Sequence, residues 1–341
     1  IFYKTYFMKY ALILCTLFCF GQKGQVYTFS FYNVENLFDA YDNPNTFDDD
    51  YTPQGRLQWT SALMHQKTAQ LAAVISQIGA KETQRPPTVI GIAEVENKNL
   101  LRDLIRNKSL APYKYGIIHF QSPDFRGIDV ALLYQKDHFL VEDQKAIKLE
   151  LTDPKTGYNR TTRDILVVSG YLAQYRISLL INHWPSRRGG KTKSAPHRMK
   201  AARLHKKITD SLMRKYPEGK IISMGDYNDN PNDKSLQWIK GKKNDEILFN
   251  PMEKMIKKGI GSLAHNDRWF LFDQLLFSFN WNKDKEIFLL KTAVFNPSFL
   301  RTKRSNYHGY PFRTKIHGTR LEGFSDHFPV YTVVGLSLSL E

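Results

Sequence analysis

Short apolar runs of strand length recur along the whole chain, and no Pro-, Gly- or Ser-rich linker separates them. Two longer segments, Ser61–Ile78 and Pro196–Tyr216, have the apolar spacing of amphipathic helices. This mixture favours a single α/β domain over residues 26–341, in which helices cover two β-sheets packed face to face. The strand-like runs are Val26–Asn33, Val89–Ala93, Tyr115–His119, Asp129–Tyr134, Ile165–Leu172, Ile177–Asn182, Lys220–Met224, Phe272–Ser278 and Val330–Val334.

The N-terminal segment has the pattern of a secretory signal peptide. A basic start at Met8-Lys9 precedes an apolar stretch from Ala11 to Phe20, and the small residue Gly21 follows it. We predict a signal peptide over residues 1–25, in which residues 1–7 are an artefact of the assigned translation start. The alternative is a buried N-terminal strand. A signal peptide places the mature protein outside a bacterial cytoplasm, either secreted or periplasmic.

Both cysteines, Cys15 and Cys19, lie inside this predicted signal peptide. The mature protein would then have no disulfide, no thiolate metal site and no cysteine nucleophile. The apolar stretch is too short to span a bilayer, so we expect no transmembrane segment after its removal.

The chain carries a formal net charge of +16. A strongly basic protein attracts polyanions, which include nucleic acids, phosphorylated small molecules and anionic membrane surfaces. The charge by itself does not choose among them. The acidic run Asp48-Asp49-Asp50 lacks the alternating ligand positions of a hard-cation loop, so we expect it to be a solvated loop.

Several of the apolar runs end abruptly in a carboxylate, an amide or a histidine. Rigid strands hold such side chains in place while the adjoining loops open a cleft. Each one alone has an ordinary explanation as a turn former or a hydrogen-bonded residue. Together they supply oxygen and imidazole ligands, a set suited to Mg²⁺ or Mn²⁺ rather than Zn²⁺. The polar ends are Asn33-Val34-Glu35-Asn36, Glu94-Val95-Glu96-Asn97, Asn182-His183-Trp184, Asp226-Tyr227-Asn228-Asp229, Asp273-Gln274 and Asp326-His327.

In this order, the polar ends resemble those of the endonuclease/exonuclease/phosphatase superfamily, including secreted Bacteroidetes-type members. The most specific motifs are Gly225-Asp226-Tyr227-Asn228 and Ser325-Asp326-His327, and the similarity extends from Asn33 to Val330. The resemblance implies a four-layer α/β sandwich of two mixed β-sheets flanked by helices. It also implies a hydrolase of phosphate esters that uses Mg²⁺, with Mn²⁺ or Ca²⁺ as alternatives.

The resemblance implies a set of metal ligands. Glu94 would be the principal ligand, supported by Glu35 and Asp326, and Asn33 would brace them on the substrate-binding side. Glu35 stands where the superfamily more often has Asp. Glu96 lies two residues beyond Glu94 and is either a second ligand or a surface carboxylate, and we favour the surface position.

The resemblance also implies catalytic roles. Asp226 would orient or deprotonate the attacking water, with Asn228 holding the water and the phosphate in line. His327, oriented by Asp273, would contact a phosphate oxygen, and His183 would donate to another oxygen or to the leaving group. Either Asp226 or the His327–Asp273 pair could serve as the general base.

Basic residues are concentrated after His183. The segment between residues 186 and 220 has twelve Lys and Arg residues and two acidic residues. We expect Arg187 and Arg188 to lie in a flexible loop that attracts backbone phosphates, and most of the following helix to be a solvated face. Arg163 resembles a phosphate-contacting arginine of the nuclease branch, and a surface salt bridge is an equal alternative.

These observations favour a secreted, Mg²⁺-dependent nuclease that cleaves DNA or RNA and functions as a monomer. The second hypothesis is a phosphatase or phosphodiesterase that acts on inositol phosphates or lipid headgroups. Apolar membrane-docking hairpins would support it, and the sequence shows none. The third hypothesis is an inactive nucleic-acid-binding module, which a missing ligand would favour, yet every central position is filled.

Overall fold

Two mixed β-sheets form the centre of the computed structural model, which describes residues 25–152, 157, 159–241, 247–303, 305–316 and 319–337. The predicted signal peptide lies outside these residues except for Gln25. Within them, each sheet has six strands. The first sheet has the order β15 (Ile287–Val294), β18 (Val330–Leu336), β1 (Gln25–Leu37), β2 (Val89–Val95), β4 (Asp129–Gln135) and β3 (Tyr115–His119). The second has the order β11 (Leu248–Phe249), β14 (Asp273–Ser278), β10 (Lys220–Asp226), β9 (Tyr175–His183), β8 (Ile165–Leu172) and β5 (Phe139–Ile147).

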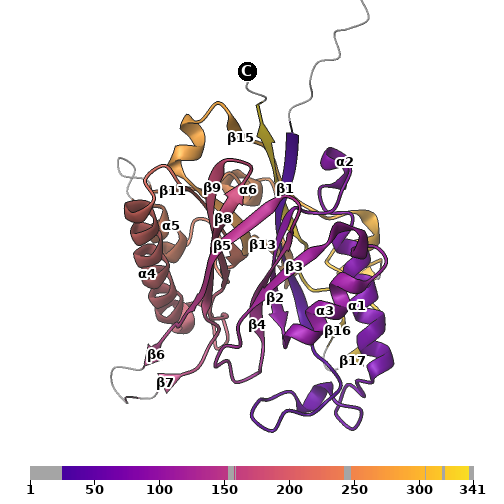
Figure 1. Cartoon of the computed structure of the whole chain (residues 1–341). Helices are drawn as coiled ribbons and strands as arrows, with labels where there is room; N and C mark the ends of the chain where they lie inside the picture. Colours follow the sequence, from indigo (N-terminus) through magenta and orange to yellow (C-terminus); the bar gives the residue numbers. More distant parts are fainter. Residues whose placement is uncertain are drawn as a thin grey trace, which may run out of the picture.

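Helices cover the outer faces of both sheets, which gives four layers (Figure 1). Helices α1 (Ser61–Ile75) and α3 (Lys98–Arg106) cover the first sheet, and α4 (Lys191–Lys215) and α5 (Lys234–Lys240) cover the second. The predicted four-layer sandwich of two mixed sheets is therefore confirmed. No helix in the described part of the chain is long and apolar enough to cross a bilayer.

The core between the sheets follows from the alternation of side chains along each strand. Phe29 and Phe31 of the first sheet lie in one apolar cluster with Ile181 and Met224 of the second. Because side chains in a strand alternate between faces, the residues two positions further along, including Asn33 and His183, continue toward the same interface. The packing of the core thus makes the polar side chains at the strand ends of the two sheets face each other.

Two long strands were missing from the sequence prediction, and both lie at sheet edges. β5 is mostly exposed or half-exposed over Phe139–Ile147, and β15 exposes Leu290 and Lys291. An edge strand has one neighbour and often a solvated face, so it lacks the continuous apolar pattern of a central strand. The central strands extend two to four residues beyond several of the predicted ends, as in β1 and β10.

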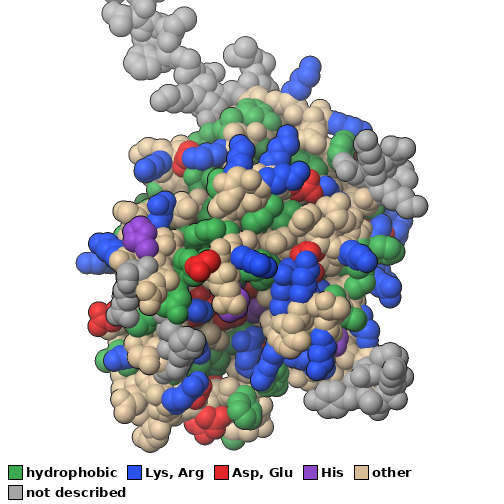
Figure 2. All heavy atoms as spheres, turned by 180° about the vertical axis from the view of Figure 1, so that it is seen from behind, with side chains coloured by type: hydrophobic (Ala, Val, Ile, Leu, Met, Phe, Trp, Pro, Cys, Tyr) green, Lys and Arg blue, Asp and Glu red, His purple; other side chains and the backbone are tan. Residues whose placement is uncertain are grey.

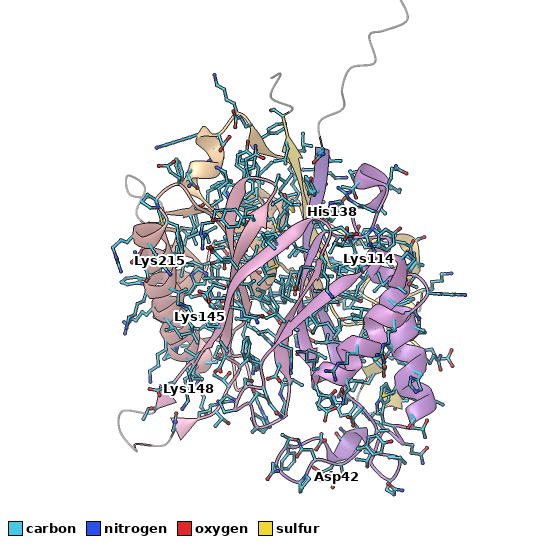
Figure 3. All side chains as sticks on the ribbon, in the orientation of Figure 1. Asp42, Lys114, His138, Lys145, Lys148 and Lys215 are labelled. Carbon is cyan, nitrogen blue, oxygen red and sulfur yellow. The ribbon has the colours of Figure 1, made fainter. Side chains whose placement is uncertain are left out.

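The segment from residue 39 to residue 59 lies at the end of the sandwich away from the C-terminus, where Asp42 is labelled (Figure 3). The expectation of a fully solvated loop is wrong for Asp48, which is 2% exposed and accepts a hydrogen bond from the Asn43 N–H at 3.2 Å. Tyr51 stacks on Phe38 with a centroid distance of 4.3 Å. This aromatic contact packs the segment onto the end of β1, so the segment is held against the core by side-chain contacts.

Lys and Arg side chains outnumber Asp and Glu side chains on the face shown in Figure 2. On α4, the prediction of a solvated face fits Lys215, which projects outward in Figure 3, and Lys207, which is exposed. It is wrong for Arg198, which is completely buried. The helix also begins at Lys191, five residues before the predicted start, so part of the expected basic loop is helical.

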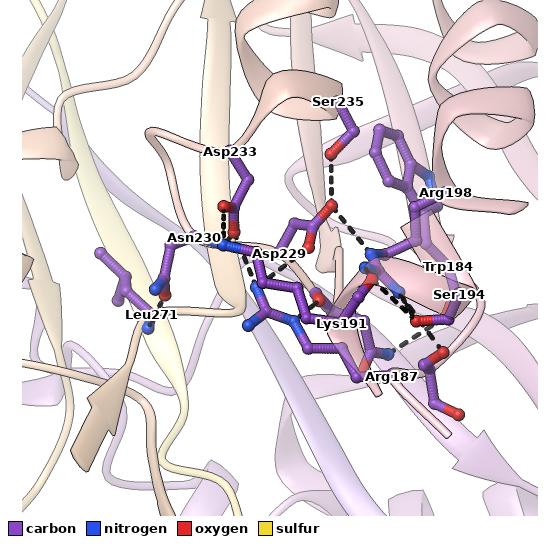
Figure 4. Close-up of polar contacts among 12 residues, drawn as sticks. Trp184, Arg187, Lys191, Ser194, Arg198, Asp229, Asn230, Asp233, Ser235 and Leu271 are labelled. Carbon is purple, nitrogen blue, oxygen red and sulfur yellow. Dashed lines mark hydrogen bonds and ion pairs between the residues drawn. The ribbon is translucent and has the colours of Figure 1, made fainter. Parts of the chain in front are cut away.

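An ionic network centred on the fully buried Arg198 and the buried Asp229 joins the start of α4 to the loop after β10 (Figure 4). Asp229 lies 2.8 Å from Arg198 and 2.9 Å from Arg187. Asp233 contacts Arg187 at 2.6 Å and Lys191 at 2.5 Å. Each carboxylate therefore contacts two cations, and Arg187 contacts both carboxylates. The network holds the loop that follows the Asp226 motif against the helix.

We expect Asp229→Ala to lower the free energy of unfolding by about 3–5 kcal/mol, because it leaves the fully buried Arg198 without its carboxylate partner. Asp210→Ala is the matched control, since Asp210 makes a half-exposed i,i+4 pair with Lys206. Pairs of that kind contribute about 0.5 kcal/mol. Urea unfolding measures both variants, and equal losses would contradict the structural role of Asp229.

His205 of α4 makes stability depend on pH. It is fully buried, contacts Ser223 Oγ through Nε2 at 2.6 Å, and its burial lowers the imidazole pKa to about 3. The unfolded chain binds this proton near the ordinary pKa of about 6.5. Stability from this group is therefore complete above pH 6.5 or so and is lost as the pH falls toward the folded-state pKa.

We expect the free energy of unfolding to fall by up to about 1.4 kcal/mol per pH unit below pH 6 through His205. His205→Gln removes the titrating group, so the acid slope of the variant should be smaller by up to that amount. Urea unfolding between pH 4 and pH 7 measures the difference. Parallel curves for the two proteins would show that His205 is not responsible.

Candidate functional site

Three of the predicted catalytic side chains form one row across the second sheet. In the pairing register, Asp226 at the end of β10 lies opposite His183 of β9 on one side and Asp273 of β14 on the other. All three are buried. Neighbouring strands thus present an imidazole and two carboxylates side by side at one end of the sheet.

The first sheet contributes the other polar ends to the same place. The Asn33 side chain donates to Asp226 Oδ2 at 3.2 Å, across the gap between the sheets. His183 Nε2 lies 3.7 Å from Glu94 Oε1 and 3.7 Å from Asp226 Oδ2. The structure therefore brings together Asn33, Glu94, His183, Asp226, Asp273 and His327, which are distant in sequence.

The backbone is strained where the first-sheet residues enter the site. Glu35, Asn36 and Glu94 have φ values of 49°, 56° and 66°, and Asn228 across the cleft has 52°. Non-glycine residues rarely adopt this region, and each costs about 1–3 kcal/mol when the surroundings enforce it. The register of β1 against β2 also shifts between Asn33 and Leu37. A bulge of this kind turns the carboxylates out of the strand direction and into the cleft.

The His327–Asp273 pair is the shortest contact between the two halves of the site. His327 Nδ1 donates to Asp273 Oδ2 at 2.6 Å, which leaves Nε2 facing Asp226 Oδ2 at 3.9 Å. Burial by itself would lower the pKa of His327, but Asp273, Asp326 and Asp226 together raise it well above its usual value. His327 is therefore suited to donate a proton toward a phosphate oxygen.

His183 has the opposite electrostatic environment. Burial and the charges of Arg163 and Arg126 lower its pKa well below the usual value, so the ring is neutral near pH 7. Its Nδ1 is buried without a hydrogen-bond partner among the described residues. The two histidines of the site therefore differ in charge, because only His327 is hydrogen-bonded to a carboxylate.

Asp226 and Asn228 are fixed by contacts on both sides. The Asn228 N–H donates to Asp226 Oδ1 at 2.9 Å, and the Asn228 side chain donates to Trp184 O at 3.0 Å. Burial raises the pKa of Asp226; His327 opposes this effect and Asp273 adds to it. A carboxylate of raised proton affinity is suited to accept a proton from water near neutral pH.

Two cations that were not among the predicted site residues lie beside Glu35 and Asp326. Arg313 lies 2.6 Å from Asp326 and 3.7 Å from Glu35. Lys67 is 2% exposed and donates to Glu35 O and to Thr314 Oγ1. Burial raises the pKa of Glu35 and lowers that of Lys67. A signal for Lys67 exists in the sequence, because it lies at helical spacing between Met64 and Leu71 on the apolar face of α1.

The donor set fits a hard divalent cation. Arg313 lies 3.7 Å from Glu35 and 2.6 Å from Asp326, and Glu35 Oε1 is buried without a hydrogen-bond partner among the described residues. The N–H of Asn36, the residue after Glu35, donates to Glu94 Oε2 at 3.1 Å, so Glu94 lies beside the same turn. A second group, Asp226, Asp273 and His327, has ligand atoms within 4.8 Å of one another. The 2.6 Å His327–Asp273 hydrogen bond uses Nδ1 and Oδ2, so His327 Nε2 and the unpartnered Asp273 Oδ1 remain as possible ligand atoms, and the site offers two candidate donor groups.

The predicted substrate-binding arginines have different surroundings. Arg163 is 6% exposed and donates to Asp124 Oδ2 and to Trp184 O, both at 2.9 Å. It is a buried ion pair rather than the surface salt bridge considered above. Arg187 donates to Asn228 O at 2.8 Å and to the two aspartates of the ionic network, so it is not in a free loop. Arg188 is exposed.

The surface position favoured for Glu96 is wrong. The residue is 6% exposed, and its Oε2 accepts a hydrogen bond from the Asp39 N–H at 2.8 Å. The bulge at Glu94 explains the error, because the strict alternation of strand side chains does not continue past it. Glu96 thus anchors the loop that follows β1.

Solved structures of TDP2 and of a phosphatase have a similar fold. Truncated Caenorhabditis elegans TDP2 has a TM-score of 0.54 and 13% identity, covering 92% of this chain and 98% of that one. D. rerio TDP2 complexed with single-strand DNA product has 0.55 and 14%, covering 91% and 99%. A mannosyl-6-phosphatase from Bacteroides thetaiotaomicron VPI-5482 has 0.54 and 17%, covering 90% and 99%. No protein of curated function matches the sequence.

At these identities the structural likeness shows the fold alone. The sequence gives independent evidence, because residues 28–335 match the model of the Endonuclease/Exonuclease/phosphatase family. The matched range contains every polar strand end described above. The chain belongs to the endonuclease/exonuclease/phosphatase family.

Proposed function

We propose that this protein is a secreted, Mg²⁺-dependent nuclease that hydrolyses phosphodiester bonds of DNA or RNA. The observation that carries the proposal is the convergence of Glu94, His183, Asp226 and His327 at the ends of two sheets. The net charge of +16 supports a polyanionic substrate. The DNA product in the D. rerio TDP2 complex shows that this fold accommodates nucleic acid in a neighbour.

The proposed reaction is attack of water on the phosphorus, in line with the departing oxygen. Asp226 accepts the proton of the water, and Asn228 and Asn33 fix that carboxylate. His327 donates from Nε2 to a phosphate oxygen, because its Nδ1 proton is held by Asp273. The neutral His183 donates to a second oxygen or to the leaving group. The alternative, in which the His327–Asp273 pair is the general base, requires a neutral His327.

Glu94, Glu35 and Asp326 would hold the metal ion in this proposal. A bound Mg²⁺ neutralises charge on the phosphate oxygens and on the leaving oxygen. Arg313 lies between Glu35 and Asp326, so we expect its guanidinium to move when the ion binds.

A phosphatase is the second candidate, because the Bacteroides thetaiotaomicron neighbour is a mannosyl-6-phosphatase of the same fold. Incubating the purified protein with a panel of substrates separates the candidates. The panel is plasmid DNA, RNA, bis-p-nitrophenyl phosphate, sphingomyelin, an inositol phosphate and mannose 6-phosphate. Turnover of a monoester without cleavage of either nucleic acid would favour the phosphatase. Binding of DNA without turnover of any substrate would favour the inactive module.

Secretion follows from the predicted signal peptide and is proposed on that basis. Expression of the full chain in a bacterial host, followed by fractionation and N-terminal sequencing, tests it. We expect the protein in the periplasm or the medium with a new N-terminus near residue 25. Full-length protein retained in the cytoplasm would contradict the proposal.

We expect Glu94→Gln to lower kcat/KM for bis-p-nitrophenyl phosphate by at least about a hundredfold, or about 2.7 kcal/mol of transition-state stabilisation. EDTA should abolish the activity of the unmodified protein, and added Mg²⁺ should restore it. Asp137→Asn is the control, since Asp137 forms an exposed pair with Lys114 on the surface. Full activity of Glu94→Gln, or cleavage in EDTA, would falsify the metal-dependent mechanism.

A further inference from the structure

A cavity beside the catalytic residues has more cationic than anionic side chains in its wall. Its volume is about 90 Å³, and four arginines line it together with a single carboxylate among the described residues: Arg126, Arg160, Arg163, Arg188 and Asp124. That volume equals roughly three molecules of liquid water, which suits a small tetrahedral anion rather than a nucleobase. The excess of positive charge favours an anion as the occupant.

Two buried donors in the cavity wall have no partner. Thr162 and Arg163 are 2% and 6% exposed. Thr162 Oγ1 and Arg163 Nε make no hydrogen bond within the described residues, although both side chains line the cavity. A buried polar group without a partner costs about 1–3 kcal/mol, so such groups usually have a ligand or water that satisfies them.

The guanidinium of Arg163 is held in position by its other two nitrogens. Nη1 donates to Asp124 Oδ2 and Nη2 to Trp184 O, which leaves Nε as the free donor. Arg126 lies 3.7 Å from Asp124 and is one-third exposed, so its charge reaches both the cavity and solvent. The arrangement is preorganised, because the fold fixes the guanidinium before any ligand arrives.

The cavity adjoins the catalytic residues through Trp184. The Trp184 carbonyl accepts from Arg163 on the cavity side and from Asn228 on the catalytic side. The charges of Arg163 and Arg126 also act on His183. An anion in the cavity would therefore lie next to the phosphate under attack.

We propose that the cavity binds a phosphate monoester group that the substrate carries in addition to the phosphodiester under attack. This inference rests on the proposed function. A phosphate monoester has about −1.5 to −2 charge at pH 7 and three acceptor oxygens, which match several guanidinium donors better than a diester with one charge does. The enzyme would then prefer nucleic acid ends that bear a terminal phosphate.

The test compares one short oligonucleotide with a 5′-phosphate, with a 3′-phosphate and with neither. We expect kcat/KM to be at least about tenfold higher for one phosphorylated form, or about 1.4 kcal/mol. Arg126→Gln and Thr162→Val should each bring that ratio toward one. Arg203→Gln removes a charge from the exposed face of α4 and should keep the ratio. Arg126 is partly exposed, so its variant remains informative if Thr162→Val is unstable.

Fluorescence anisotropy in EDTA measures the affinity for the same three oligonucleotides without turnover. If a phosphorylated form binds more tightly and Arg126→Gln removes the difference, the cavity assignment is supported. If in addition no oligonucleotide is cleaved, only the proposed nuclease function is wrong. Equal cleavage and equal affinity for all three forms overturn the cavity assignment and leave the nuclease function standing. A preference that survives both cavity variants also overturns it.

Discussion

The catalytic cluster depends on two hydrogen bonds that cross between the sheets. His327, which precedes β18 of the first sheet, bonds Asp273 of the second, and Asn33 of β1 bonds Asp226 of β10. Each bond joins the end of a strand in one sheet to the end of a strand in the other. The apolar core between the two sheets is closely packed, so the sheets do not slide past each other. The two hydrogen bonds therefore keep the two sides of the cleft at a fixed separation.

The site combines this rigid support with local backbone strain. Glu35, Glu94 and Asn228 have positive φ angles, and the hydrogen bond from the Asn36 N–H to Glu94 Oε2 at 3.1 Å helps to retain the turn. Sheet packing supplies the stability that offsets the strain. The result is a set of carboxylates that point into a shared space, which regular strands could not achieve.

Much of the positive charge near the site is structural. Lys67, Arg187 and Arg198 are bound to carbonyls, hydroxyls or aspartates inside the protein, and they hold loops in place instead of meeting solvent. Other cations remain available in the wall of the arginine-lined cavity and on outer faces such as the exposed face of α4. Net charge therefore overstates the number of side chains that can contact a polyanion.

The sequence by itself determined the fold class and the identity of the strand-end residues, because an apolar run that stops at Asp226, or one that starts just after His327, is a local pattern. It could not place Glu96 or Arg187, since a bulge and a buried ion network decide their surroundings. It did not place Lys67 or Arg313 beside the site: Lys67 bonds the Glu35 carbonyl, 32 residues away, and Arg313 pairs with the Glu35 and Asp326 carboxylates. Edge strands such as β5 also required the structure. Tertiary packing decided which charges are buried, because burial depends on partners that no local window of sequence contains.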